Sequence, residues 1–126
     1  MRARAIVAAT LMAVLLVGGA TQAFAKDGDV VRQGACSGPS DWKLKLSNEN
    51  GRIEVEFEVD QNVNGVAWDV ELSRNGKVVV TATRTTHAPS GSFSIERRLT
   101  NGAGPDTISA EATSPSGEVC TATATI

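Results

Sequence analysis

Apolar and polar side chains alternate along most of the chain, and the longest such stretch runs over 42–60. Its apolar positions lie on both sides of a polar segment, Asn48-Glu49-Asn50-Gly51. A period of two places one set of side chains on a buried face of a strand and the other in water. The pattern therefore predicts a β-hairpin with a four-residue loop at 48–51. The predicted pairs are Leu46 with Ile53, Lys45 with Glu54, Leu44 with Val55, Lys43 with Glu56 and Trp42 with Phe57.

A second hairpin is predicted from residues 66–73 and 77–84, which flank the dipeptide Asn75-Gly76. Both residues of this dipeptide tolerate positive φ, which a two-residue hairpin turn requires. A continuous ladder from this turn places Leu72 opposite Val79.

In that register Val78 and Val80 lie on the outward face, so the return strand is apolar on both sides. We expect the loop at 85–92 to fold over these two valines and make them part of the core. A surface for a partner protein or for a second copy is the alternative.

Shorter alternating runs predict strands at 30–36, 93–100, 107–113 and 119–126, with turn residues between them and no helical period. About seven short strands at near-regular spacing predict an all-β fold, an antiparallel β-sandwich. Arg97 falls in the apolar phase of its strand and marks either a bulge or a sheet edge.

The first 25 residues differ from the rest: a basic start, an apolar run and the small-x-small sequence Ala23-Phe24-Ala25. They predict a secretory signal peptide at 1–25 and a single domain at 26–126. A single transmembrane anchor is the alternative. After cleavage the domain has ten basic and fourteen acidic residues, a net charge of −4. That balance argues against nucleic acid or an anionic membrane as a partner.

The chain has two cysteines, Cys36 and Cys120. An even number of cysteines in an exported chain favours a disulfide. The bond would close a loop of about 85 residues, worth about 4.5 kcal/mol in the chain-entropy model. Two free thiols or a metal-binding pair are the alternatives, although two cysteines so far apart and one histidine make a poor metal site.

The strand pattern resembles an immunoglobulin-like or fibronectin type III-like sandwich over residues 30–126. Trp68 lies on the third strand after the N-terminal arm, where such domains often bury a tryptophan. The chain has no tyrosine and therefore no tyrosine corner. Cys36 and Cys120 lie too near the chain ends to be the usual inter-sheet pair, and we expect them to join the first strand to the last. In composition and signal peptide the chain is similar to small uncharacterised secreted proteins of actinobacteria.

One motif has calcium-binding spacing. Asp60, Asn62, Asn64 and, after Gly65 and five further residues, Glu71 match the pattern of an EF-hand loop. That loop needs a helix on both sides, whereas both flanks here alternate as strands. A plain Asn-Gly turn is therefore the preferred interpretation, and we predict no metal.

The connection at 85–92 is the longest irregular segment and contains the only histidine, His87. Catalysis would require a nucleophile and an orienting acid near it. Ser90 and Ser92 share the loop but no acid does, so an exposed loop residue is the preferred interpretation. Long loops often carry binding sites, and we take Arg84, His87 and Pro89 as a candidate binding loop.

These patterns predict a secreted, non-enzymatic β-sandwich that needs no cofactor and serves as an extracellular binding or structural module. The expected partner is an extracellular protein or a cell-wall component, with no nucleic acid and, after signal cleavage, no membrane. An inhibitor of a secreted enzyme, acting through residues 85–92, is one alternative. A small hydrolase that depends on His87 is the less favoured one.

Overall fold

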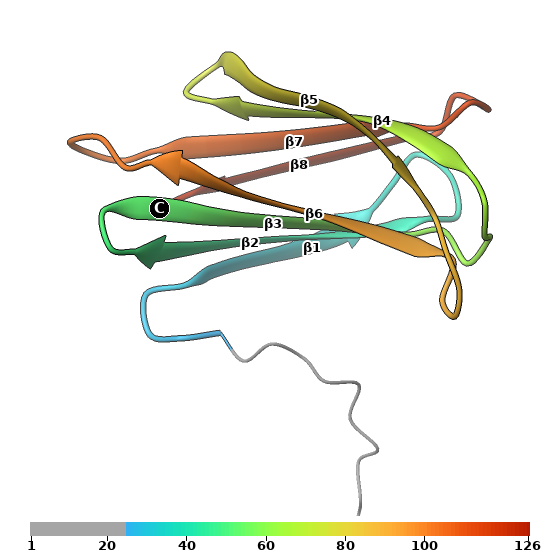
Figure 1. Cartoon of the computed structure of the whole chain (residues 1–126), viewed down its shortest axis with the longest axis horizontal. Coiled ribbons are helices and arrows are strands. Elements are labelled where there is room, and N and C mark those ends of the chain that lie inside the picture. Colours follow the sequence, from blue (N-terminus) through green and yellow to red (C-terminus); the bar gives the residue numbers. More distant parts are fainter. Residues whose placement is uncertain (1–24) are drawn as a thin grey trace, which may run out of the picture.

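The computed structural model describes residues 25–126, which form two antiparallel four-stranded sheets packed face to face (Figure 1). The strand order is β1-β2-β3-β6 in one sheet and β5-β4-β7-β8 in the other. The predicted all-β sandwich is therefore confirmed, with eight strands where about seven were expected. The predicted signal peptide lies outside the described residues except for Ala25. The strands are β1 Val30–Ala35, β2 Asp41–Glu49, β3 Arg52–Asp60, β4 Ala67–Arg74, β5 Lys77–Thr85, β6 Ser92–Thr100, β7 Thr107–Thr113 and β8 Val119–Thr125.

The first hairpin forms between β2 and β3, but its register differs from the predicted one by two residues. The turn consists of Asn50 and Gly51 alone, with φ values of 50° and 77°. Such a turn matches the twist of the strands, so both strands continue up to it and the expected four-residue loop does not form. A shift of two leaves every side chain on its predicted face. The observed pairs are Leu46–Val55, Lys45–Glu56, Leu44–Phe57, Lys43–Glu58 and Trp42–Val59.

The second hairpin turns at Asn75-Gly76 as predicted, with φ values of 49° and 82°. Its ladder is not continuous, however, because β5 has one extra residue at a bulge. Ser73 lies opposite Val78, whereas Leu72 lies opposite Val80. The predicted pair of Leu72 with Val79 was therefore wrong.

The bulge reverses the two faces of β5 beyond it. Val80 and Ala82 point to the core and are half-buried, and Thr81 and Thr83 point to solvent. The continuous register would have buried the threonine hydroxyls and exposed the aliphatic side chains. Burial of apolar area therefore favours the bulge, because each buried CH₂ contributes about 0.8 kcal/mol.

The valines at the start of β5 have different environments. Val78 is 46% exposed and Val79 is 42% exposed, whereas Val80 packs against the core. The loop at 85–92 lies beyond the other end of β5 and packs against residues 61–66. The expectation that this loop covers Val78 was therefore wrong.

The core lies between the sheets, with Trp68 fully buried at 0% exposure and its ring centroid 6.1 Å from that of Phe93. Trp42 is half-buried and lies over Gly34, where an added Cβ would come within 2.7 Å of the indole ring. Cys36, directly after β1, and Cys120, in β8, form the predicted disulfide. It joins the first strand to the last across the two sheets.

The predicted choice at Arg97 between a bulge and an edge is settled as an edge. β6 is the outer strand of its sheet, and it pairs with β3 in unbroken register. Within residues 25–126, no helix long and apolar enough to cross a membrane is present.

Candidate functional site

Two exposed irregular segments of the sandwich meet at one end of it. Because all strand pairs are antiparallel, alternate connections lie at the same end, and the β3–β4 and β5–β6 connections are neighbours there (right-hand side of Figure 1). We call residues 61–66 and 86–91 together the loop end. This end contains the candidate binding loop.

Thr86 holds the two loops of the loop end together at their base. Its side chain is 1% exposed, and its hydroxyl donates to the carbonyl of Val63 at 2.6 Å and accepts from the N–H of Val66 at 3.0 Å. Its backbone N–H donates to Val66, and its carbonyl accepts from the N–H of Gly65 at 2.7 Å. One buried threonine thus satisfies polar groups of both loops, which would otherwise be costly to bury.

Gly91 makes the second contact between the two loops. Its φ is +64°, and an added Cβ would lie only 2.3 Å from the backbone nitrogen of Val63. Its carbonyl accepts from the N–H of Gln61 at 3.0 Å. Glycine is required here both for the left-handed conformation and for the close approach of two backbones.

Above this base the loop end presents a mixed surface of apolar and polar side chains. Val63 is 52% exposed, and the whole tip of the other loop is exposed: His87, Ala88, Pro89 and Ser90. Arg84, the third residue of the candidate binding loop, lies instead on β5, is half-buried and donates to the carbonyl of Thr83 at 2.9 Å. The structure therefore places His87 and Pro89 at the same end of the sandwich as Val63 and leaves Arg84 on β5.

The His87 side chain and the two serines of its loop make separate hydrogen bonds. Its Nδ1 lies 3.1 Å from the carbonyl of Ala88, and Ser90 Oγ lies 2.6 Å from Ser92 Oγ. In the part of the chain that the structure describes, neither serine is hydrogen-bonded to the imidazole. A base–nucleophile pair, the first requirement for acyl transfer, is not assembled here.

The candidate calcium ligands are drawn apart. Asp60 Oδ1 accepts from the N–H of Asn62 at 3.1 Å, an arrangement that supports the turn itself, and Asn62 and Asn64 are exposed. Glu71 lies within β4 on the outer face, directly opposite Glu111 of β7. Among residues 25–126, no group of three or more His, Cys, Asp or Glu side chains is placed to hold a metal ion.

A hollow of about 290 Å³ on the outer face of the first sheet is lined by charged residues of the N-terminal arm, β2 and β3. Lys26 forms an ion pair with Glu49, which raises the pKa of Lys26 and lowers that of Glu49. A hydrogen bond from the Ser47 hydroxyl and another from the Lys26 backbone N–H, which lies 2.7 Å from Asp29 Oδ2, lower the pKa of Asp29. These mutual contacts dock the arm, and they pair the Lys26 and Glu49 side chains of the hollow with each other.

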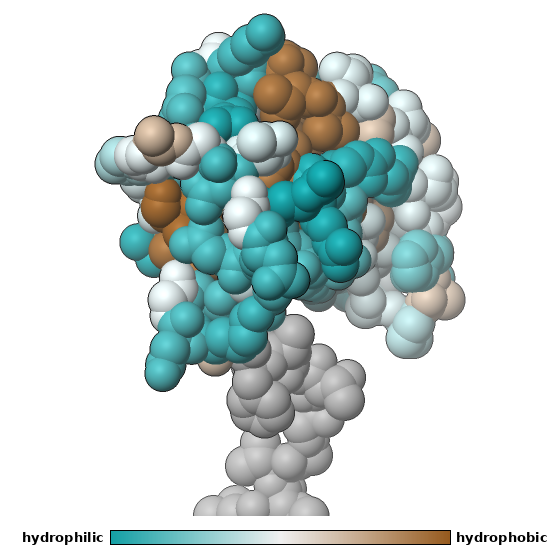
Figure 2. Space-filling model, turned by 60° about the vertical axis from the view of Figure 1, so that its left-hand side comes forward, coloured by the Kyte–Doolittle hydropathy of each residue, from teal (hydrophilic) through white to brown (hydrophobic). Residues whose placement is uncertain are grey.

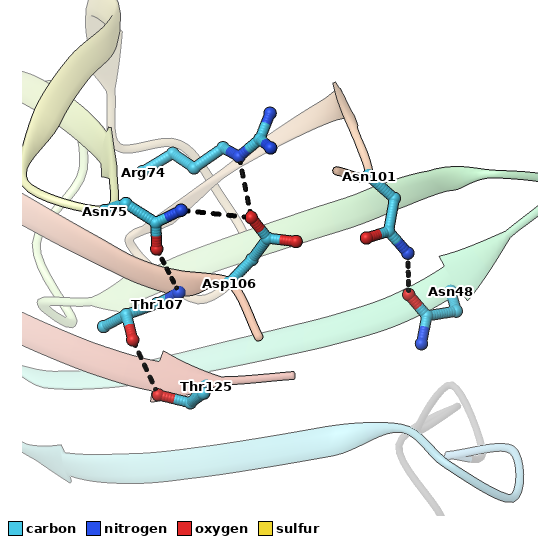
Figure 3. Close-up of polar contacts among 7 residues, drawn as sticks. All are labelled: Asn48, Arg74, Asn75, Asn101, Asp106, Thr107 and Thr125. Carbon is cyan, nitrogen blue, oxygen red and sulfur yellow. Dashed lines mark hydrogen bonds and ion pairs between the residues drawn. The ribbon is translucent and has the colours of Figure 1, made fainter. Parts of the chain in front are cut away.

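A polar cluster closes the opposite end of the sandwich (Figure 3). Asp106 is 2% exposed, and its Oδ1 accepts from Arg74 Nε at 2.9 Å and from Asn75 Nδ2 at 3.2 Å. The Asn75 side chain in turn accepts from the N–H of Thr107 at 2.8 Å. The cluster ties the β4–β5 turn to the β6–β7 connection. His87 lies at the other end of β6, so this carboxylate and the imidazole cannot act on one substrate.

Sequence reasoning missed the residues that shape the loop end. Thr86 and Gly91 have no local pattern that distinguishes them, because each is important only through a loop more than 20 residues away. The bulge in β5 did leave a signal, since Val80 and Ala82 share one phase and Thr81 and Thr83 the other.

Comparison with known proteins assigns no family: no family model matches the chain, and neither a curated protein nor a solved structure is significantly similar to it.

Proposed function

We propose that this chain is a secreted, non-enzymatic recognition module that binds an extracellular protein through its loop end. The observation that carries the proposal is the fixed base of this end, where buried Thr86 of one loop bonds to residues 63, 65 and 66 of the other, beneath an exposed tip of apolar and polar side chains. A loop held in one conformation before binding loses little conformational entropy on binding. Functional residues in sandwich folds are commonly placed on loops that a rigid scaffold positions.

Secretion and an immunoglobulin-like assignment belong to the same proposal. The Cys36–Cys120 disulfide supports an oxidising, extracellular location. The chain passes between the sheets after β3, β5 and β6, as in a Greek-key sandwich, and Trp68 is buried in the core. An origin in actinobacteria rests on the style of the sequence alone.

The second candidate, an inhibitor of a secreted enzyme, is favoured by the shape of one loop. The bridge between His87 and Ser92 closes the base of the β5–β6 loop, so that Ala88 and Pro89 stand at its tip. A tip fixed at both sides suits insertion into an active-site cleft, as preorganised loops lower the cost of ordering on binding.

Photo-crosslinking at the tip tests the proposal. The disulfide-bonded domain 26–126 would have Ala88 replaced by p-benzoyl-phenylalanine, and a matched variant would have the same replacement at exposed Thr123 of β8. Both would be irradiated with host culture supernatant and with cell walls. We expect one protein to be captured from position 88 only, and to be lost when unlabelled domain is added in excess. Equal capture from both positions, no capture, or retention on cell walls alone would overturn it.

A further inference from the structure

In the outer strands of the two sheets, some of the backbone groups are already hydrogen-bonded by other parts of the chain. On β1, β5 and β6 an arginine donates to the carbonyl of the residue before it. These bonds are Arg32 to Val31 at 3.0 Å, Arg84 to Thr83 at 2.9 Å and Arg97 to Glu96 at 2.8 Å. On β8 the first residue, Val119, is bonded in both directions to Ser37. Unpaired edge backbone is a template for another chain, so these contacts limit where a strand can add.

The backbone of β5 is the exception over part of its length. Thr86 exchanges hydrogen bonds with residues 65 and 66, so the even-numbered residues of this strand direct their backbone groups toward β4. Thr81 and Thr83, in the other phase, direct theirs toward the free edge. Arg84 occupies the carbonyl of Thr83 only. Because β5 is the outer strand of its sheet, the N–H and C=O of Thr81 and the N–H of Thr83 pair with no strand among residues 25–126.

Apolar side chains are exposed next to this open backbone. The bulge leaves Val78 and Val79 at 46% and 42% exposure, and the only other large apolar residue so exposed among residues 25–126 is Val63 at the loop end. Figure 2, which brings forward the left-hand end of Figure 1, shows a hydrophobic patch in a mainly hydrophilic surface near the β4–β5 hairpin. Exposed apolar groups at a sheet edge are features of strand-addition sites.

The strands β5 and β6 together carry a net positive charge, whereas the whole domain is net negative. β5 and β6 are outer strands of the two sheets and contact each other over a small part of their length. Together they hold four of the ten basic residues of the domain and only one of its fourteen acidic residues. Two copies would therefore repel each other edge to edge, whereas an acidic partner would be attracted. Lys77 and Arg84 stand on either side of the valines, about 23 Å apart along an extended strand.

We propose that the edge of β5 from Lys77 to Arg84 binds an extended segment of another protein as an added antiparallel strand. The segment is about eight residues long, acidic at both ends and apolar at alternate positions between. Its backbone pairs with Thr81 and Thr83, its apolar side chains contact Val78 and Val79, and its terminal carboxylates face Lys77 and Arg84. This surface lies apart from the loop end and does not depend on the function proposed there.

Synthetic peptides test the mode of binding directly. The probe is the acetylated, fluorescent peptide Glu-Thr-Val-Thr-Val-Thr-Val-Glu, with fluorescence anisotropy measured on the disulfide-bonded domain in low salt. We expect saturable binding, about tenfold weaker when lysine replaces both glutamates. N-methylation at every second residue should abolish binding in one phase and spare it in the other, because only alternate residues face β5. Absence of binding at millimolar peptide, equal binding of the lysine peptide, or indifference to N-methylation in both phases would overturn the proposal.

Variants locate the site, and a matched pair controls for folding. Val79→Thr should weaken binding of the glutamate peptide about fivefold, whereas the same change at Val63, which is also exposed but lies at the loop end, should leave it unchanged. Equal thermal midpoints will show that both variants fold. Arg84→Gln should remove most of the preference for glutamate over lysine peptides. If Arg84→Gln instead tightens binding of both peptides equally, Arg84 only blocks the edge and recognition of an acidic segment is refuted.

Discussion

Two replacements of Asp106 should distinguish what its charge contributes to stability from what its hydrogen-bonding shape contributes. The carboxylate is 2% exposed, and its Oδ1 accepts from both Arg74 and Asn75. Asp106→Ala removes both bonds and leaves the guanidinium without its counter-charge. Breaking a buried ion pair by removing one partner costs about 3–5 kcal/mol. Because the Arg74 side chain remains 25% exposed and can be partly rehydrated, we expect a loss near the lower limit, about 3 kcal/mol.

Asp106→Asn should cost much less, for a reason that lies in the second carboxylate oxygen. Oδ2 of Asp106 is buried and has no hydrogen-bond partner among the described residues. In Figure 3 this oxygen and the side-chain oxygen of Asn101 point toward each other. Asparagine keeps the Oδ1 acceptor and can place an N–H donor in the position of Oδ2, facing Asn101. We therefore expect a loss of about 1 kcal/mol, the difference between a charged and a neutral hydrogen bond.

Urea unfolding with the disulfide intact will measure both changes, with the fluorescence of buried Trp68 as the probe. Asp41→Ala, at an exposed position of β2, is the control and should change stability by less than about 0.5 kcal/mol. The m value should stay constant, since none of the changes alters the surface exposed on unfolding. If Asp106→Asn destabilises as much as Asp106→Ala, or if Asp106→Ala matches the control, the account of this cluster is wrong.

Three further predictions concern other parts of the sandwich. Thr86→Val keeps the shape of the side chain but removes the hydroxyl bonds to the carbonyl of Val63 and the N–H of Val66. It should lower the free energy of unfolding by about 1–3 kcal/mol in urea, unlike the same change at the exposed threonine before it. Glu111→Lys should raise stability by up to about 1 kcal/mol at low salt, because Glu111 lies directly opposite Glu71; an unchanged thermal midpoint would contradict this. Contacts in the docked arm lower the pKa of Asp29, so its ionised carboxylate stabilises the docked arm at pH values above the ordinary carboxyl pKa. This stabilisation is lost as the pH falls through the lowered pKa. Ser47→Ala should move the midpoint of Asp29, followed by NMR, to higher pH.

The features that the sequence predicts well are those set by neighbouring residues. Alternation predicts the strands, the polar segment at 48–51 predicts the first hairpin, and the dipeptide Asn75-Gly76 predicts the second, because turn geometry depends on the φ preferences of adjacent residues. The first loop is nevertheless two residues shorter than the four-residue loop that this segment predicts. Asn50-Gly51 has the same chemistry as Asn75-Gly76, which is why the chain turns in two residues at both places.

The features that the sequence does not predict depend on agreement between distant segments. A turn at Asn75-Gly76 with a continuous ladder would point Val80 and Ala82 away from the core. The bulge in β5 allows both the turn and the burial of these two side chains, and neither feature alone predicts it. The docking of the two loops through Thr86 and Gly91 is of the same kind. Such contacts form only when distant segments come together in the complete fold, so the local sequence preferences predict them poorly.

The same strand, β5, links the two surfaces for which a binding role is proposed, yet each should respond to different substitutions. The loop end begins at Thr86, where the backbone is bonded to residues 65 and 66, and the edge surface ends at Arg84. Sites without shared partners usually contribute independently to stability and binding. Thr86→Val should therefore weaken capture at position 88 without changing affinity for the acidic peptide, and Val79→Thr should do the reverse. If either change affects both readouts in a folded domain, the two surfaces form one site that extends along β5.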